Sequence, residues 1–148
     1  DLVLCHNVLQ YVADAPASLR GLSSLLAPGG LISLVSLNRL SSVYAAAFLR
    51  QDLRFALAEI DARTMHSTLF DTLLTIYSAQ EACAMLEAAG CVVEQDYGLL
   101  CITSYWGDNE RKRDPVIYAQ LEQLELALTD KEPYKRLARY YQVIARKV

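Results

Sequence analysis

Two stretches decide the fold: Asp1-Leu2-Val3-Leu4-Cys5-His6-Asn7 and Leu31-Ile32-Ser33-Leu34-Val35-Ser36-Leu37-Asn38-Arg39. Each is a short apolar run that ends at polar residues, which is typical of a strand buried on both faces of a sheet. Between them, Asp14 is placed to cap a helix and Pro28-Gly29-Gly30 ends it. Strand, helix and strand in this order predict two parallel strands joined by a right-handed crossover. The helix carries its apolar stripe at helical spacing: Leu19, Leu22, Leu25 and Leu26.

The middle of the chain is less regular. Residues 41–60 are rich in Ala and Leu and predict one or two helices, whereas residues 61–77 show no clean period and predict a loop. Ser78 and Glu81 then form a capping box for a helix that Gly90 ends. Its predicted core-facing stripe comprises Ala82, Met85, Leu86 and Ala89.

The last third adds strands and one long helix. Residues 91–105, interrupted at Gly98, favour one bent strand or two. Asp114-Pro115 opens an amphipathic helix through about Leu128, and residues 140–145 predict a final strand. The alternation of strands and helices along the whole chain predicts a layered α/β sheet.

Composition excludes several classes of protein. A chain of 148 residues with 53% hydrophobic side chains suffices for about one domain core and excludes disorder. A net charge of −3 means that any nucleic-acid contact must come from a local patch. We find no apolar run of membrane-spanning length and no basic leader, and we expect a cytoplasmic protein. The 4 cysteines form no CxxC pair, so we expect reduced thiols and no metal site.

Polar groups follow both early strands. Cys5-His6-Asn7 ends the first, and Ser36-Leu37-Asn38-Arg39 ends the second. Ligands of open α/β sheets bind beyond the carboxyl ends of the strands, so these groups mark a candidate site. The alternative is that they only cap the strands. Gly29-Gly30 follows a helix and precedes a strand, which indicates a turn and not a phosphate-binding loop.

Two parts of the sequence carry a family resemblance. Asp1 to Val12, Leu25-Leu26-Ala27-Pro28-Gly29-Gly30 and the strand from Leu31 resemble the second half of class I S-adenosylmethionine-dependent methyltransferases. The ending is similar to the bacterial tRNA 5-carboxymethoxyuridine methyltransferases, through Glu132-Pro133-Tyr134, Leu137-Ala138-Arg139-Tyr140 and Val143-Ile144-Ala145-Arg146-Lys147. The resemblance covers residues 1–40 and 78–147. It implies a Rossmann-like sheet of which this chain supplies strands four to seven, the last antiparallel between its neighbours. Residues 1–148 would then be the C-terminal part of a single methyltransferase domain, without the half that holds the cofactor loop.

The resemblance also implies a cofactor and an acceptor. The cofactor is S-adenosyl-L-methionine, with His6 facing it and Cys5 and Asn7 as neighbours; the alternative for His6 is a half-buried imidazole at a helix start. The acceptor is the carboxylate of a carboxymethoxyuridine at a tRNA wobble position. Asn38 and Arg39, and then Arg63, are the candidates for holding that carboxylate, although Arg39 is equally well explained as a surface cation. The candidates for base stacking are Tyr11, Tyr44 and Trp106, for which the alternative is anchoring a core edge.

Charge is distributed unevenly between the two parts of the chain. Residues 110–148 hold 9 Lys or Arg against 6 Asp or Glu, whereas residues 1–109 hold 5 against 11. Two groups of cations are therefore candidate RNA contacts: Arg111-Lys112-Arg113, and Lys131, Lys135, Arg136 and Arg139. A solvated helix face gives the same count. Two alternatives remain for the function. One is a small-molecule methyltransferase of the same fold, and the other is a non-catalytic fragment or interaction module.

Overall fold

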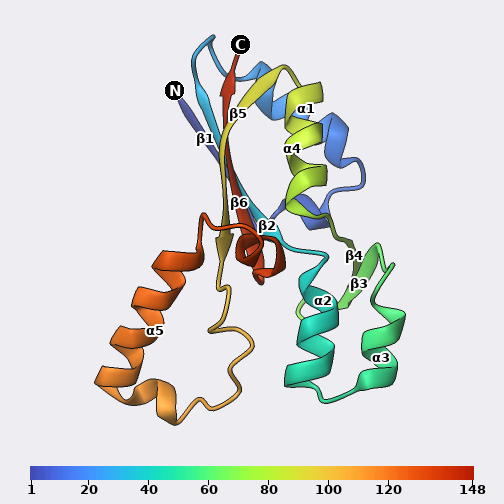
Figure 1. The fold of residues 1–148 in the computed structure, drawn as a ribbon. Coiled ribbons are helices and arrows are strands. Elements are labelled where there is room, and N and C mark those ends of the chain that lie inside the picture. Colours follow the sequence, from blue (N-terminus) through green and yellow to red (C-terminus); the bar gives the residue numbers. More distant parts are fainter.

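The computed structural model describes residues 1–148 and contains a four-stranded sheet and a separate two-stranded hairpin (Figure 1). The sheet order is β1-β2-β6-β5. Strand β1 (Leu2–His6) pairs in parallel with β2 (Leu31–Leu37), as the strand-helix-strand pattern predicted. Strand β6 (Tyr140–Lys147) lies antiparallel between β2 and β5 (Cys91–Leu99). The expected antiparallel last strand is therefore confirmed.

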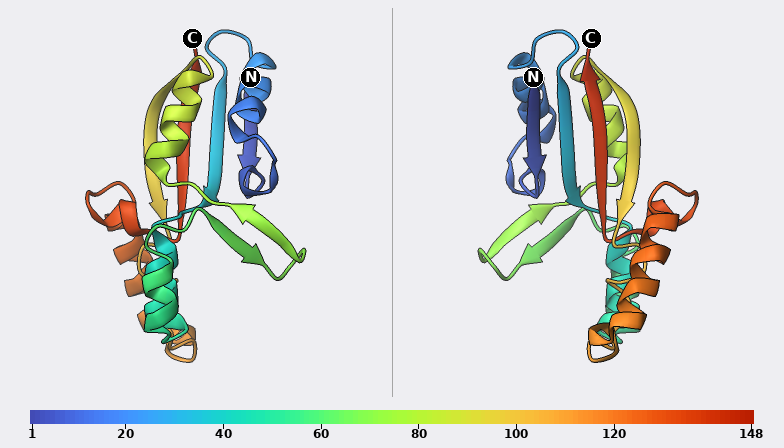
Figure 2. Two further views of the ribbon diagram at one scale, coloured as in Figure 1. Left: turned by 90° about the vertical axis from the view of Figure 1, so that its right-hand side faces the viewer. Right: turned by 90° about the vertical axis from the view of Figure 1, so that its left-hand side faces the viewer.

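Two helices cover one face of the sheet (Figures 1 and 2). Helix α1 (Ala15–Ser24) begins at Asp14, whose carboxylate accepts the backbone N–H of Ala17 at 2.8 Å. Helix α4 (Ala79–Ala88) begins with the predicted capping box. Both helices begin where a side chain accepts a hydrogen bond from backbone N–H groups that have no partner within the helix.

The main hydrophobic core lies between these helices and the sheet. Leu19 and Leu26 from the predicted stripe are buried there, but Leu25 is 73% exposed. Leu25 is the C-cap of α1, where the helical spacing that would turn it inward has ended. The bulkiest fully buried side chains include Leu19, Ile32, Leu34, Leu86, Tyr141 and Val143.

Residues 41–77 form a small subregion beyond the carboxyl ends of β1 and β2 (Figures 1 and 2). The predicted helices of residues 41–60 are present as α2 (Ser41–Tyr44), a π-helical continuation (Ala45–Leu49) and α3 (Leu53–Ala58). The prediction of a loop for residues 61–77 was wrong, because β3 (Thr64–Ser67) and β4 (Thr72–Thr75) form an antiparallel hairpin. Each strand has only 4 residues, too few for a visible period. A small cluster of Leu74 and Ile76 against Leu37 of the sheet anchors the hairpin.

The last third of the chain follows the predicted order with one difference. Strand β5 runs through Gly98 and ends at Leu99, so residues 100–105 form turns instead of a second strand. Helix α5 (Pro115–Leu128) confirms the predicted helix, and a 3₁₀ helix (Tyr134–Leu137) leads into β6. Helix α5 extends beyond the same end of the sheet as α2 and α3 (Figure 1).

Two further expectations concern membranes and cysteines. None of the helices combines the length and apolar composition needed to cross a bilayer. All 4 cysteines are free, and Cys5, Cys91 and Cys101 are buried. No group of three or more His, Cys, Asp or Glu side chains is arranged to hold a metal ion.

Candidate active site

The carboxyl ends of β1 and β2 form a rim on which polar groups gather. His6 lies opposite Val35 in the parallel register, and the backbone N–H of Asn7 donates to the carbonyl of Val35 at 2.8 Å. Asn7 has a φ of +56°, a left-handed conformation that Asn tolerates better than most residues. The chain therefore turns sharply at the end of β1 and leaves His6 and Asn7 exposed at the rim.

Side chains alternate between the two faces of β1, so the three residues expected at the cofactor do not all lie on one face. Cys5 is buried in the main core, and this burial raises the pKa of its thiol. Cys5 and His6 point to opposite faces, as adjacent side chains of a strand do, and the place of Cys5 beside the cofactor stays a prediction. His6 is on the opposite face, where its Nε2 lies 2.9 Å from the Oγ of Ser33. The cofactor-facing role of His6 and Asn7 stays a prediction.

The side-chain amide of Asn38, which was predicted to be a substrate ligand, makes its hydrogen bonds within the fold. Its side chain is 1% exposed, and its Nδ2 donates to the backbone carbonyls of Arg136 and Ala138, at 2.9 Å each. Its Oδ1 accepts the backbone N–H of Leu40 at 3.2 Å. The side-chain amide of Asn38 therefore holds the segment before β6 against the end of β2.

Tyr105 holds the same segment from the other side. Its hydroxyl donates to the backbone carbonyl of Leu137 at 2.6 Å. Burial raises the pKa of the Tyr105 phenol to about 12, so the hydroxyl keeps its proton and remains a donor near neutral pH. Asn38 and Tyr105 together fix the backbone immediately before Arg139.

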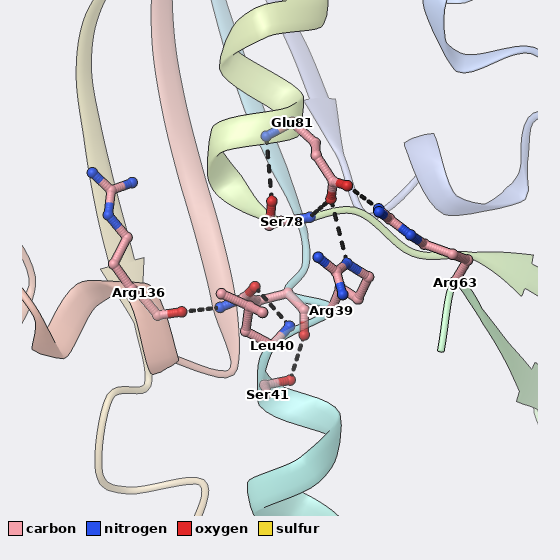
Figure 3. Close-up of polar contacts among 8 residues, drawn as sticks. Arg39, Leu40, Ser41, Arg63, Ser78, Glu81 and Arg136 are labelled. Atoms are coloured by element: carbon pink, nitrogen blue, oxygen red, sulfur yellow. Dashed lines mark hydrogen bonds and ion pairs between the residues drawn. The ribbon is translucent and has the colours of Figure 1, made fainter. Parts of the chain in front are cut away.

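Arg39 and Arg63 lie close together, but a carboxylate of the chain itself occupies the space between them. Figure 3 shows Glu81 with Arg39 on one oxygen and Arg63 on the other. The Nε of Arg39 lies 3.4 Å from Oε2 of Glu81, which also accepts the backbone N–H of Ser78 at 2.7 Å. Both guanidinium groups are thus paired, and a substrate carboxylate would have to compete with Glu81.

Lys135 and Arg136 form an ion cluster with Asp96 on β5. The Nζ of Lys135 lies 2.7 Å from Oδ1 of Asp96, and Nη1 of Arg136 lies 2.8 Å from Oδ2. Arg136 also pairs with Glu132. Lys135, which was predicted to contact RNA, has a side chain that is only 9% exposed and forms an ion pair with Asp96, so the RNA contact stays a prediction. Arg136 is partly exposed, but its charge is balanced by two carboxylates.

Arg139 has a different environment from its two neighbours in the sequence. It lines a cavity of about 550 Å³ between the strand ends and the hairpin, which we call the rim cavity. Asn7, Tyr11, Arg50 and His66 line it too. The rim cavity has two guanidinium groups and no carboxylate in its lining. Tyr11, predicted to contact the substrate, is partly exposed there and packs edge-on against Phe70 with ring centroids 5.4 Å apart.

A second cavity of about 560 Å³ continues from the first between the hairpin and the helices α2 and α3; we call it the helix cavity. Its only acidic lining residue is Glu59, which makes no ion pair with either arginine within 4.0 Å. Arg139 donates to the Oγ of Ser41 at 3.2 Å, and Arg50 lies over the ring of Phe55 at 5.0 Å. Both cations therefore lack a carboxylate partner. The residues common to the two cavities are Arg50, Met65, His66, Thr68 and Arg139.

Sequence reasoning missed Arg50 and the hairpin residues of this site. Arg50 sits in a helical stretch with other charges and carries no local signal of its own. His66, in the segment predicted to be a loop, lies on β3, and its Nε2 is 3.1 Å from Oδ1 of Asp71. Only the packing of the hairpin against the strand ends brings these residues to Arg139.

Comparison with solved structures gives the class of fold. An S-adenosylmethionine-dependent methyltransferase from Mesorhizobium loti aligns over 99% of this chain and 61% of its own, with a TM-score of 0.61 and 16% identity. A methyltransferase from Thermotoga maritima, described as a possible histamine N-methyltransferase, aligns over 100% of this chain and 56% of its own, with a TM-score of 0.55 and 13% identity. The fold is therefore the Rossmann-like fold of class I methyltransferases.

Sequence comparison then gives the family. Residues 1–96 match the family described as methyltransferase domain, and the chain belongs to that family. The tRNA 5-carboxymethoxyuridine methyltransferase of Escherichia coli strain K12 is 32% identical over 149 residues, which cover 99% of this chain and 54% of that protein. The protein of the same name from Escherichia coli O157:H7 is 32% identical over 151 residues. The chain spans about half the length of these curated relatives.

Proposed function

We propose that the protein containing this chain transfers a methyl group from S-adenosyl-L-methionine to a carboxylate of a modified uridine in tRNA. The observation that carries the proposal is the pair Arg50 and Arg139, which line a shared cavity without a carboxylate partner. Two unpaired guanidinium groups in one cavity attract an anion, and the planar fork of Arg matches a carboxylate with two parallel hydrogen bonds. The acceptor of this proposal is therefore an anion before it reacts.

A carboxylate acceptor needs positioning more than proton transfer. A carboxyl group of ordinary pKa is ionised near neutral pH, and two neighbouring cations lower its pKa further. The nucleophile is thus ready without a general base. The task of Arg50 and Arg139 is to hold one carboxylate in a fixed direction, which is the kind of contribution that orientation makes to a rate.

In this proposal the rim of β1 supplies one wall of the cofactor site. His6 and Asn7 are exposed there, and only Nε2 of the His6 imidazole is hydrogen-bonded, which leaves Nδ1 available. When bound, the cofactor supplies a methyl group on a sulfonium, which is a good leaving group. In this proposal His6 and Asn7 hold the cofactor, and residues 1–148 are the C-terminal part of a single methyltransferase domain that supplies one side of its cleft.

Support for a tRNA acceptor comes from the name of the 32% identical Escherichia coli relative, which aligns along nearly all of this chain. Arg139 lies within the part of the ending that the resemblance rests on, and Tyr11 adds an aromatic ring to the wall of the rim cavity. Aromatic side chains stack on unpaired bases in many RNA-binding proteins. A nucleoside whose carboxylate meets the two arginines would have its base near this ring.

The test uses the full-length protein, the cofactor labelled with tritium on its methyl group, and two tRNA preparations. One preparation carries 5-carboxymethoxyuridine at the wobble position, and the other carries unmodified uridine there. We expect label in the first RNA only, in a form that mild alkali releases because the product is a methyl ester. Label in both RNAs, or no label in the RNA that carries 5-carboxymethoxyuridine, would contradict the proposal.

A further inference from the structure

A third cavity, of about 730 Å³, lies beside the proposed active site and has no role in the function proposed above. It is formed between the end of the π-helical segment at Phe48 and the loop from Thr103 to Lys112, which follows β5. We call it the loop pocket. Leu49 lines both the loop pocket and the helix cavity, so the two are direct neighbours. A polymer held at Arg139 could therefore continue into the loop pocket.

Two aromatic rings face this pocket from opposite walls. Phe48 is 60% exposed although it is one of the larger apolar side chains, and its ring stacks on Tyr44 with centroids 6.0 Å apart. Trp106 is partly exposed in the opposing loop, with the guanidinium of Arg111 at 5.5 Å from its ring centroid. Exposed aromatic rings in a pocket that is otherwise polar are typical of sites where nucleobases stack.

Two cations at the end of the loop, Arg111 and Lys112, have no carboxylate partner within 4.0 Å. The Nζ of Lys112 donates to the backbone carbonyl of Thr103 at 2.9 Å and to Oδ1 of Asn109 at 3.0 Å, both of which are neutral groups. Arg111 has no carboxylate within 4.0 Å of its guanidinium, whereas Arg113 pairs with Glu110 at 3.0 Å. No acidic residue lines the pocket. The charge that remains there is positive and suits a phosphate.

The remaining lining is suited to the edges of bases. Gln51 and Asn109 present amide groups, and Thr103 and Ser104 present hydroxyl groups. Amides and hydroxyls both donate and accept hydrogen bonds, as the edges of unpaired bases do. Rings, amides and the ammonium group of Lys112 thus meet in one cavity next to the proposed site of the acceptor carboxylate.

We propose that the loop pocket binds an unpaired nucleotide of single-stranded RNA adjacent to the modified uridine, with its base against Trp106 and Phe48 and its phosphate near Lys112 and Arg111. This proposal rests on the proposed function for its acceptor. It adds a second contact surface that would distinguish an anticodon loop from a free nucleoside, and it assigns the selectivity for RNA to the loop after β5.

A binding experiment tests the pocket without any methyl transfer. The full-length protein is titrated with a seven-nucleotide unmodified RNA, and the Trp106 signal is isolated as the fluorescence difference between the wild type and Trp106→Phe. We expect saturable quenching of that difference signal, since bases that stack on an indole quench it. Lys112→Ala should lower the dependence of log K on log salt concentration by about 0.7, the value for one phosphate on a single strand, and Arg113→Ala should leave it unaltered. Absence of quenching, or equal quenching by polyglutamate at the same ionic strength, would overturn the proposal.

A kinetic experiment tests the selectivity. The readout is the KM for an anticodon stem-loop carrying 5-carboxymethoxyuridine divided by the KM for the free nucleoside. Trp106→Ala should raise this ratio about 10-fold, which is the effect of losing one stacked base, and Trp106→Phe should restore most of it. Tyr118→Ala, an exposed aromatic on α5 outside the pocket, is the matched control. An unaltered ratio in Trp106→Ala would overturn the inference. Failure of the wild type to methylate either substrate would instead refute the proposed function, and the fluorescence titration would still decide on the pocket.

Discussion

The backbone N–H of Asn38, directly after β2, donates to the backbone carbonyl of Arg139, directly before β6, at 3.1 Å. The same Asn38 holds the carbonyls of Arg136 and Ala138 with its side-chain amide. A buried residue on one strand end thus fixes the backbone that carries an arginine of the proposed site. In the proposed function Asn38 therefore contributes indirectly, through the position of Arg139.

Replacing Asn38 should therefore reduce both stability and the effect of Arg139. Asn38→Ala leaves two buried carbonyl groups without their donor, which we expect to lower the free energy of unfolding by about 2–4 kcal/mol. Urea denaturation measures this change. Gln120→Ala, exposed on α5, should change the free energy by less than about 0.5 kcal/mol. A loss in Asn38→Ala no larger than in this control would refute the structural role.

The ion cluster at Asp96 gives a second prediction. Asp96→Asn removes the nearer of two carboxylates that compensate Lys135, since Glu132 lies 3.8 Å away and is more exposed. The Lys135 side chain is 9% exposed, and we expect a loss of about 3 kcal/mol in the free energy of unfolding. Lys135→Met should cost less, because an apolar chain of similar length can occupy the same space. Thermal denaturation of both variants measures the difference. Equal losses would show that burial of the Lys135 charge is not what makes Asp96 necessary.

Much of the sheet could be predicted from the sequence because its signals are local. The capping residues Asp14 and Ser78 lie within three residues of the amides that they bond, and β1 and β2 are largely apolar runs. The hairpin was not predictable in this way, because its four-residue strands gain their stability from packing on Leu37 of another strand.

The candidate site was harder to predict because its members are far apart in the chain. Lys135 belongs to a run of charges typical of an exposed surface, and its partner Asp96 is 39 residues away. Asn38 at a strand end has the same residue type as a substrate ligand, and only its bonds to residues 98 and 100 positions later show its role. Arg139 was recognised as a candidate cation, but the cavity that it shares with Arg50 exists only in the folded chain.

Glu125 gives a prediction about pH. Its carboxylate on α5 accepts the backbone N–H groups of Cys101, Ile102 and Thr103 at 2.6–2.9 Å, and so holds the start of the loop that carries Trp106. Burial alone would raise the pKa of the Glu125 carboxyl, but the hydrogen bonds from these residues outweigh burial and lower it from its ordinary 4.5. A lowered pKa in the folded state stabilises the fold fully above the ordinary value, and the contribution is lost as pH falls through the lowered value.

We therefore expect Glu125→Gln to lose about 1 kcal/mol of unfolding free energy at neutral pH, a modest figure because the carboxylate is partly exposed to water. The difference from the wild type should shrink as the pH falls below 4.5. Urea denaturation across this pH range measures the effect, with Glu122→Gln on the exposed face of the same helix as the control. A constant difference at all pH values would contradict the assignment to the ionised carboxylate.

Gly98 gives a prediction about close packing. A Cβ at this position would lie 2.6 Å from the Cα of Lys135, because β5 passes directly beside the 3₁₀ helix before β6. Backbone atoms cannot move aside cheaply, so Gly98→Ala should lower the free energy of unfolding by about 1–3 kcal/mol. Gly21→Ala is the opposite case, since Gly21 lies inside α1 and a Cβ added there would meet nothing within 4 Å. It should raise stability by up to about 1 kcal/mol. Equal effects of the two substitutions would contradict the close contact at Gly98.

The proposed function depends above all on Arg139, which together with Arg50 would hold the carboxylate of the acceptor. The decisive quantity is the kcat/KM of the full-length protein for a stem-loop carrying 5-carboxymethoxyuridine, measured for the wild type, Arg139→Lys and Arg139→Ala. Loss of a charge-assisted pair of hydrogen bonds predicts a fall of about 100-fold in Arg139→Ala and a smaller fall in Arg139→Lys, which keeps the charge without the fork. A kcat/KM for Arg139→Ala within about twofold of the wild-type value would contradict this role of Arg139.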